Sequence, residues 1–112
     1  MKRSSAAQIQ HNFDPANVLY LTGDVNYCTL HLLNGERILS SRTLKWYNSR
    51  WPDFIRIHKG YLVNPQHIHS CVQLSPIVAY LIMRNGVSLS IGRRRIIEVM
   101  NLLELNSVQS AS

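Results

Sequence analysis

Two Asn-Gly dipeptides, at residues 34–35 and 85–86, lie between runs of strand-forming residues. Asn-Gly is the strongest short signal of a β-hairpin, because both central positions of its turn need a positive φ angle. Residues 87–91, Val-Ser-Leu-Ser-Ile, alternate strictly between apolar and polar, as a strand with one buried face does. The strands expected around the two turns are 28–33 with 37–40, and 77–84 with 87–91. With further strands at 18–21 and 68–74, the sequence predicts a mainly β fold of small stacked antiparallel sheets built from hairpins.

A second strand-like stretch, residues 54–64, reads Phe-Ile-Arg-Ile-His-Lys-Gly-Tyr-Leu-Val-Asn. Its two isoleucines would face one side of a strand, with Arg56 and His58 on the other. Lys59-Gly60 interrupts the alternation, and Gly accepts backbone angles that a side chain forbids. The pattern predicts a bulge or tight bend at which these cationic side chains crowd together on a presented surface.

Two helices are expected among the strands. Residues 41–50 favour a short helix that Ser41 caps and Pro52 ends, with Leu44 and Tyr47 near one face. We expect it as a lid over the open end of a sheet. Residues 93–105 favour an amphipathic helix whose apolar face holds Ile96, Ile97, Met100 and Leu103. The domain is expected to cover 17–105, after a polar lead-in (1–16) with a short strand at 7–10 and before a frayed tail (106–112).

The charged residues are unevenly distributed along the chain. The net charge is +6 over 112 residues, and no acidic residue lies between Asp53 and Glu98. That interval holds six of the cationic side chains: Arg56, Lys59, Arg84, Arg93, Arg94 and Arg95. A surface that serves solubility alone usually mixes the two signs. The segregation predicts an anionic partner.

The two cysteines, Cys28 and Cys71, are too few for a disulfide framework, and no secretory signal precedes them. Both lie in apolar, strand-like runs, which predicts buried thiols in a reducing compartment. No apolar run approaches the length that crosses a bilayer. We expect a soluble, cytoplasmic protein with no membrane partner.

Gly92 is followed by three arginines, Arg93 to Arg95, at the start of the last expected helix. Cations in a first helical turn oppose the macrodipole, by about 0.3–1 kcal/mol each at low salt. Arginines beside exposed backbone N–H groups form a phosphate site, and guanidinium also reads guanine edges bidentately. The cluster therefore indicates nucleic-acid binding, with solvation of a helix end as the simpler alternative.

Taken in order, these pieces resemble the LytTR-type DNA-binding domain of bacterial transcriptional regulators over about residues 17–104. The matching pieces are residues 54–64, Ile68, Asn85-Gly86 and 89–94 (Leu-Ser-Ile-Gly-Arg-Arg), with Val18-Leu-Tyr-Leu, Asn26-Tyr27 and Thr43-Leu44 upstream. The resemblance implies stacked β-sheets that read double-stranded DNA through loops. It also implies a transcriptional regulator, as in response regulators, with two copies, as a dimer, on repeats about one helical turn apart.

The family's DNA-facing positions fall in three loops of this sequence: Asn26 and Tyr27, Lys59 and Gly60, and Arg93 with Arg94. The family often has Arg-Ser where this chain has Lys59-Gly60, and serine where it has Gly92. Lysine is a point donor without the guanidinium fork, so Lys59 either reads a base or holds phosphate. From the residues alone we add Arg56, His58, Arg95 and, at the second hairpin turn, Arg84 as candidate DNA contacts. His58 is as often a structural hydrogen-bonding residue, and Asn64 is expected to satisfy backbone groups in its turn.

Three other kinds of site are alternatives to DNA binding. His67, His69 and Cys71 on one strand face, with Cys28 or His31, would suit zinc, but their spacing does not demand it. A small basic ribonuclease would need His58, Glu36 and an arginine as acid, base and phosphate clamp, yet the basic stretch lacks an acid. A protein-interaction module would use Trp46 and Trp51, which are more simply explained as helix packing. We expect no enzyme activity, no cofactor and no metal.

Overall fold

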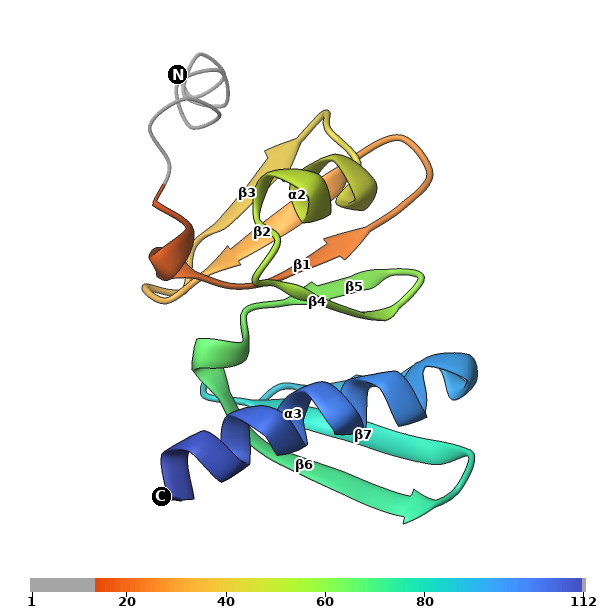
Figure 1. Cartoon of the computed structure of the whole chain (residues 1–112). Coiled ribbons are helices and arrows are strands. Elements are labelled where there is room, and N and C mark those ends of the chain that lie inside the picture. The colour runs from red at the N-terminus through yellow and green to blue at the C-terminus, as the bar shows by residue number, and fades with distance from the viewer. Residues whose placement is uncertain (1–13, 112) are drawn as a thin grey trace.

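The computed structural model describes residues 14–111, with side chains up to Glu104. It contains a five-stranded antiparallel sheet in the order β3-β2-β1-β5-β4 and a three-stranded antiparallel sheet in the order β6-β7-β8 (Figure 1). The first sheet consists of β1 (Val18–Gly23), β2 (Cys28–Leu32), β3 (Arg37–Ser40), β4 (Ile55–His58) and β5 (Tyr61–Val63). The second consists of β6 (Ile68–Ser75), β7 (Val78–Met83) and β8 (Ser88–Ser90). The helices are α2 (Leu44–Arg50) and α3 (Ile96–Ala111), with the 3-10 turns η1 (Pro15–Asn17), η2 (Pro65–His67) and η3 (Arg93–Arg95).

Both Asn-Gly hairpins form as predicted, but only the glycine of each pair, and not the asparagine, has a positive φ angle. Gly35 and Gly86 have φ angles of 91° and 89°, and they are the only residues with positive φ in the described part of the chain. The side-chain oxygens of Asn34 and Asn85 each accept the amide two residues on, from Glu36 and Val87. The mainly β fold of stacked, hairpin-built sheets with two helices is confirmed. The strand expected at 7–10 lies outside the described residues.

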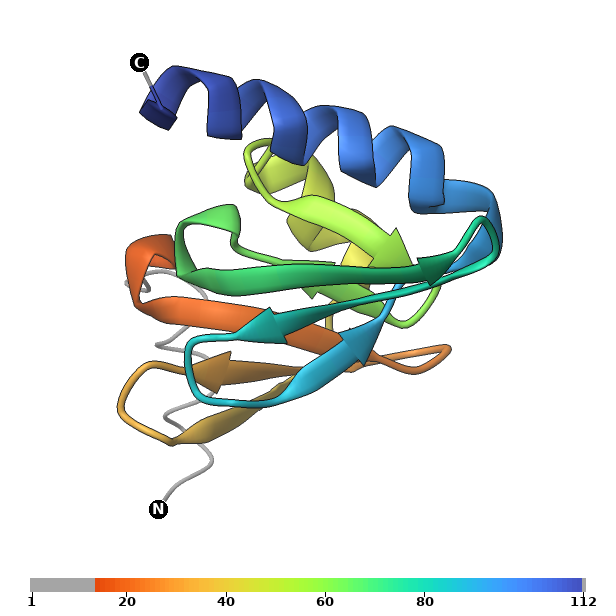
Figure 2. The same cartoon turned by 90° about the horizontal axis from the view of Figure 1, so that it is seen from below.

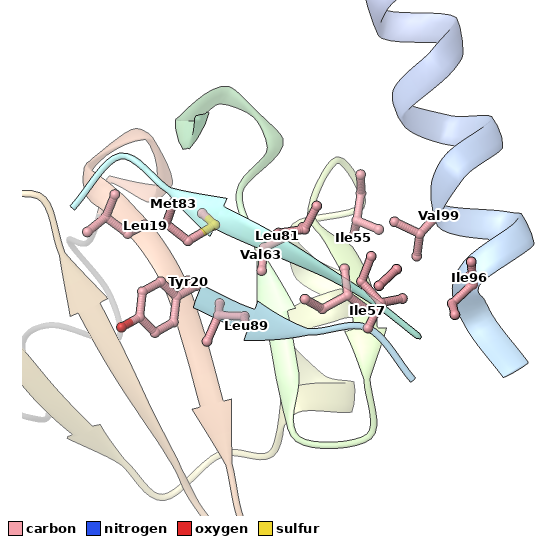
Figure 3. Close-up of a cluster of buried hydrophobic side chains, with 12 residues drawn as sticks. Leu19, Tyr20, Ile55, Ile57, Val63, Leu81, Met83, Leu89, Ile96 and Val99 are labelled. Atoms are coloured by element: carbon pink, nitrogen blue, oxygen red, sulfur yellow. The ribbon is translucent and has the colours of Figure 1, made fainter. Parts of the chain in front are cut away.

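The five-stranded sheet is covered on both faces. One face packs against α2, and the core between them holds Val18, Leu21, Cys28, Leu30, Leu32, Leu44, Tyr47, Phe54 and Leu62. The other face packs against the three-stranded sheet. Figure 3 shows this second core, where Ile57 of β4 meets Leu81 of β7 and where Ile96 and Val99 of α3 close the side. The alternation in β4 is as predicted, since Ile55 and Ile57 are buried while Arg56 and His58 are half-buried.

The mid-chain helix is shorter than expected. Thr43, not Ser41, is its N-cap, because the Thr43 hydroxyl accepts the amide of Trp46 at 3.1 Å. Leu44 and Tyr47 are buried, as predicted from their spacing. The helix covers a face of the five-stranded sheet and not its open end, where we expected it, because Leu44 and Tyr47 pack among the buried side chains of that face.

The last helix begins at Ile96, because the three arginines form the 3-10 turn η3 in front of it. Its buried face is set by Ile96 and Val99, with Met100 and Leu103 partly buried. The prediction for Ile97 was wrong, since its side chain is 77% exposed. Successive helical residues are about 100° apart, so a face centred on Ile96 and Val99 turns Ile97 to solvent. The helix continues to Ala111, through residues that we assigned to the tail.

The two cysteines differ in exposure. Cys28 is buried, as predicted, but the prediction for Cys71 was wrong, because β6 is an edge strand and leaves that side chain exposed. The Sγ atom of Cys71 lies 3.6 Å from the sulfur of Met100 in α3. Within residues 14–111, neither helix is long and apolar enough to cross a membrane.

Candidate nucleic-acid interface

Three loops meet at one end of the molecule: the β1–β2 loop (24–27), the β4–β5 turn (59–60) and the segment after β8 (92–95). Two backbone hydrogen bonds hold them together. The amide of Gly23 donates to the carbonyl of Gly60 at 2.9 Å, and the amide of Gly92 donates to the carbonyl of Ile57 at 2.6 Å. Figures 1 and 2 both place the β1–β2 loop and the start of α3 at this end. We call residues 24–27, 59–60 and 92–95 the loop rim.

Two of the predicted DNA contacts, Arg56 and His58, form hydrogen bonds with the backbone of the β4–β5 turn. The guanidinium of Arg56 donates to the carbonyls of His58 at 3.0 Å and Lys59 at 2.6 Å. The His58 ring accepts the Gly60 amide at Nδ1, at 3.0 Å, and lies 4.8 Å from the Tyr61 ring. Burial, and secondly the charge of Arg95, lower the pKa of Arg56. Arg56 and His58 thus shape the turn, and Lys59 is the exposed cation at its tip.

The arginine cluster stands beside this turn. Arg93 and Arg94 are exposed, whereas Arg95 is half-buried and close enough to Arg56 to lower its pKa. The sequence predicted that the arginines oppose the helix macrodipole from within the first helical turn. Because they precede the α-helix, their charges lie one turn further from the helix N-terminus than predicted. A Cβ on Gly92 would lie 3.5 Å from the Ile57 carbonyl oxygen, an ordinary contact, so the family's serine would fit there.

The β1–β2 loop adds polar and apolar groups to the rim. Asn26 is exposed and Tyr27 is 45% exposed. Asp24 is the acidic residue of the rim; its carboxylate accepts the Val25 amide at 2.8 Å, and its own amide donates to the Tyr27 carbonyl. An open hollow lies between this loop and the β4–β5 turn, lined by residues 22–25 and 58–61.

Residues 9–104 match the family model of the LytTr DNA-binding domain. The chain belongs to the LytTR family of DNA-binding domains. The resemblance found in the sequence is confirmed, and the chain is a LytTR DNA-binding domain. Its fold is similar to the LytTr DNA-binding domain of a protein described as a methyl-accepting/DNA response regulator from Bacillus cereus, at 21% identity and a TM-score of 0.72, over 79% of this chain and 82% of that one. No curated protein matches the chain.

One predicted contact of this LytTR domain lies elsewhere. Arg84 follows β7, and its amide donates to the carbonyl of His67 in η2 at 3.0 Å. Both residues are at the end opposite the loop rim, since β5 runs from the rim toward η2 and β8 runs back to Gly92. The structure therefore does not bring Arg84 together with the other candidates.

The alternative sites are not assembled in the LytTR domain. His67 lies in η2 and not on β6 with His69 and Cys71, and its Nε2 is 2.8 Å from the Ala16 carbonyl oxygen. Among residues 14–111, no group of three metal-ligating side chains comes together. Glu36, in the β2–β3 turn, is at the opposite end from His58, which separates the acid and base of the ribonuclease hypothesis.

Two further predictions about single residues are confirmed. Asn64 satisfies backbone groups, because its amide nitrogen donates to the carbonyls of Val18 and Pro15 and its oxygen accepts the Gln66 amide. Trp46 and Trp51 pack against the core beneath α2, which is the simpler explanation that we gave for both.

Sequence reasoning did not include Arg42 and Lys45 among the candidates. Both are exposed and flank the N-terminus of α2, and the Arg42 guanidinium carbon lies 4.6 Å from the centre of the Trp46 ring. The sequence did hold a signal for Arg42, because Arg42 comes four residues before Trp46. In an expected helix, side chains four residues apart can contact each other.

Proposed function

We propose that the loop rim is the surface with which this LytTR domain binds double-stranded DNA in a sequence-specific manner to regulate transcription. The supporting observation is the Gly92–Ile57 hydrogen bond, which sets Arg93 and Arg94 beside the Lys59 turn. A single duplex can then meet both groups of cations at once. Four cations of the rim, Lys59 and Arg93 to Arg95, carry no acidic neighbour in their own loops.

Within the rim we assign different tasks to different side chains. Lys59, Arg93 and either Asn26 or Tyr27 reach base edges in the major groove, while Arg94 and Arg95 hold phosphates. Arg56, His58 and Gly60 act indirectly, because their hydrogen bonds fix the shape of the turn that presents Lys59. Lys59 lacks the guanidinium fork, so its base contact is a single donor and not a bidentate pair.

We further propose that two copies bind neighbouring repeats about one helical turn apart, as a dimer on DNA. One turn of B-DNA is about 34 Å. The two shorter extents of the molecule are 31 and 25 Å, so two copies fit side by side on such repeats without overlap. The proposed role involves no catalytic step, and it is exercised in the cytoplasm, where the chromosome of a bacterium lies.

Selection of bound duplexes from a random pool tests the proposal. We expect the chain to enrich a motif that occurs twice, with its copies about 10 base pairs apart. Arg93→Ala should weaken binding to that motif and reduce discrimination against variants of it. Arg84→Ala is the matched control, because it removes the same charge at the opposite end and should leave both unchanged. Absence of any enriched motif, or an equal loss in the two variants, would contradict the assignment of the rim.

A further inference from the structure

The mid-chain helix α2 begins at the same end of the molecule as the loop rim. Ser40 at the end of β3 pairs with Cys28, and Cys28 pairs with Gly23 at the end of β1. A Cβ placed on Gly23 would overlap the side chain of Leu44, the first residue of α2. The start of the helix therefore lies directly against the strand that leads into the β1–β2 loop, as Figure 1 shows.

Arg42, just before this helix, is held in place at two points. Its amide donates to the Ser40 hydroxyl at 3.1 Å, and that hydroxyl also accepts the Tyr47 hydroxyl at 2.7 Å. Ser40 and Tyr47 are 4% and 3% exposed, so the anchor is part of the core. The guanidinium lies over the Trp46 ring at 4.6 Å. Stacking uses the flat face of the group and leaves its in-plane N–H donors free for an anion.

From these contacts we infer that Arg42, with exposed Lys45 beside it, is a fourth DNA-contacting element, which holds backbone phosphates. The inference rests on the proposed function of the loop rim. Across the sheet, the end of β3 is four strand spacings from the end of β4, or about 19 Å at ~4.8 Å each. The major groove is about 12 Å wide. When the loop rim lies across the major groove, the η3 arginines therefore face one of the phosphate backbones that border the groove, and the α2 cations face the other.

The same helix supplies a control for this inference. Arg50 also stacks on Trp46, at 5.0 Å, but it is the last residue of α2 and lines a hollow with Asp14 and Asp53, away from the loop rim. The six residue steps from Leu44 carry it about 9 Å along the helix axis. Arg42 and Arg50 therefore share a charge and a stacking partner and differ in their distance from the rim.

The test is the salt dependence of duplex binding by the full chain, with the enriched motif on a duplex that has flanking base pairs. Two phosphate contacts from the rim, at Arg94 and Arg95, would give a slope of log affinity against log salt of roughly −2 per bound copy, and Arg42 and Lys45 would steepen it to roughly −4. We expect Arg42→Ala and Lys45→Ala each to reduce the slope by about 1 and to weaken matched and mismatched duplexes by the same factor, roughly tenfold near 0.1 M salt. Arg42→Lys should retain the slope.

In a second experiment, the flanking base pairs are removed so that the duplex contains only the motif. Trimming should weaken the unaltered chain and the Arg50→Ala variant alike, and it should weaken Arg42→Ala less, because that variant has only the Lys45 contact left to lose. The inference is overturned if Arg42→Ala and Lys45→Ala both behave like Arg50→Ala while Arg93→Ala still weakens binding. If instead the unaltered chain shows no salt-sensitive duplex binding, the proposed function itself fails. Lys45→Ala keeps the test valid if the anchored Arg42 cannot be replaced without loss of folding.

Discussion

The amide nitrogen of Gly92 lies 2.6 Å from the carbonyl oxygen of Ile57, in a hydrogen bond that joins the segment after β8 to the edge strand β4. Ile57 belongs to the five-stranded sheet, whereas Gly92 follows the last strand of the three-stranded sheet. Because Ile57 is buried in the core shared by both sheets, the position of the arginine cluster relative to the Lys59 turn depends on how the sheets pack. The loop rim is therefore a property of the whole domain and not of either hairpin alone.

Lys59 should contribute to sequence discrimination as well as to affinity. We expect Lys59→Ala to weaken binding to the selected motif by roughly tenfold, the lower end of the effect of a base contact, and to weaken mismatched duplexes less. Competition binding with single-base variants of the motif measures this difference. An equal loss on all duplexes would assign Lys59 to phosphate instead.

Gly23 should not tolerate a side chain, whereas Gly60 should. A Cβ at Gly23 would overlap the Cγ of Leu44, so Gly23→Ala must displace the start of α2 and should destabilise the domain by about 1–3 kcal/mol. At Gly60 the nearest atom would be the Gly23 carbonyl oxygen at 3.5 Å, an ordinary contact. Gly60→Ala should therefore change the free energy of unfolding by less than about 0.5 kcal/mol. Urea unfolding of the two variants provides the comparison, and a reversed order would show that the α2 contact is misassigned.

Removal of the Arg56 guanidinium should loosen the β4–β5 turn. Arg56→Ala deletes the guanidinium donors to the carbonyls of His58 and Lys59. Amide hydrogen exchange at Gly60 and Gly23 should become faster, because both amides are bonded within or onto this turn. Arg84→Ala serves as the control and should leave both rates unchanged. Unaltered exchange in Arg56→Ala would mean that the turn does not depend on Arg56.

His31 should make the domain less stable in mild acid. Burial, and secondly the charge of Arg37, lower the pKa of His31 below its usual 6.5. Its Nε2 lies 3.0 Å from the Thr22 hydroxyl, and its ring stacks on Tyr20 at 4.3 Å. Below pH 6.5 the unfolded chain gains a proton that the folded chain resists, so the stabilisation present above 6.5 is lost as the pH falls.

His31→Gln retains a hydrogen-bonding group but does not titrate. Urea unfolding at pH 7 and pH 5 should therefore show a larger loss of stability in the unaltered chain than in the variant. Comparison of the two chains cancels the contributions of the other histidines. Equal losses would exclude His31 as the group responsible.

The two thiols should differ in reactivity. Burial raises the pKa of Cys28 to about 12, so it stays protonated near neutral pH and is inaccessible. Burial also raises the pKa of Cys71, but less, and its side chain is exposed. A thiol reagent at pH 8 should label one cysteine per folded chain quickly and both after denaturation. In Cys71→Ser the rapid phase should disappear; its persistence would place the reactive thiol at Cys28.

The parts of the fold that depend on local sequence were predictable. Asn34-Gly35 and Asn85-Gly86 set their turns with their own backbone angles and side-chain oxygens, and both hairpins formed. Three of the four residues predicted for the buried face of α3, namely Ile96, Met100 and Leu103, do contact the core. Ile97 was included because it is apolar, but the same helical spacing places Val99 on this face and Ile97 in solvent.

The candidate site was predictable as a set of loops but not as a set of side chains. A cation on a strand can face a ligand or the backbone, and only the fold reveals that Arg56 turns toward the carbonyls of its own turn. Arg84 was added because it adjoins a hairpin turn, yet strand direction carries that turn to the far end of the molecule. Arg42 was overlooked because it lies far from the loop rim in the sequence. The tertiary contact between Gly23 and Leu44 brings it to the same end of the molecule.

Titration of the isotope-labelled chain with the selected duplex, followed by amide NMR, locates the DNA-binding surface most directly. We expect the largest shift changes at residues 24–27, 59–60 and 92–95, with changes at 42–46 if α2 holds the flanking phosphates. The turns at 34–36 and 84–86, at the opposite end, should be unaffected. If the largest changes occur around Arg84 and His67 while the loop rim stays unchanged, the duplex binds a different surface and the assignment of the rim is wrong.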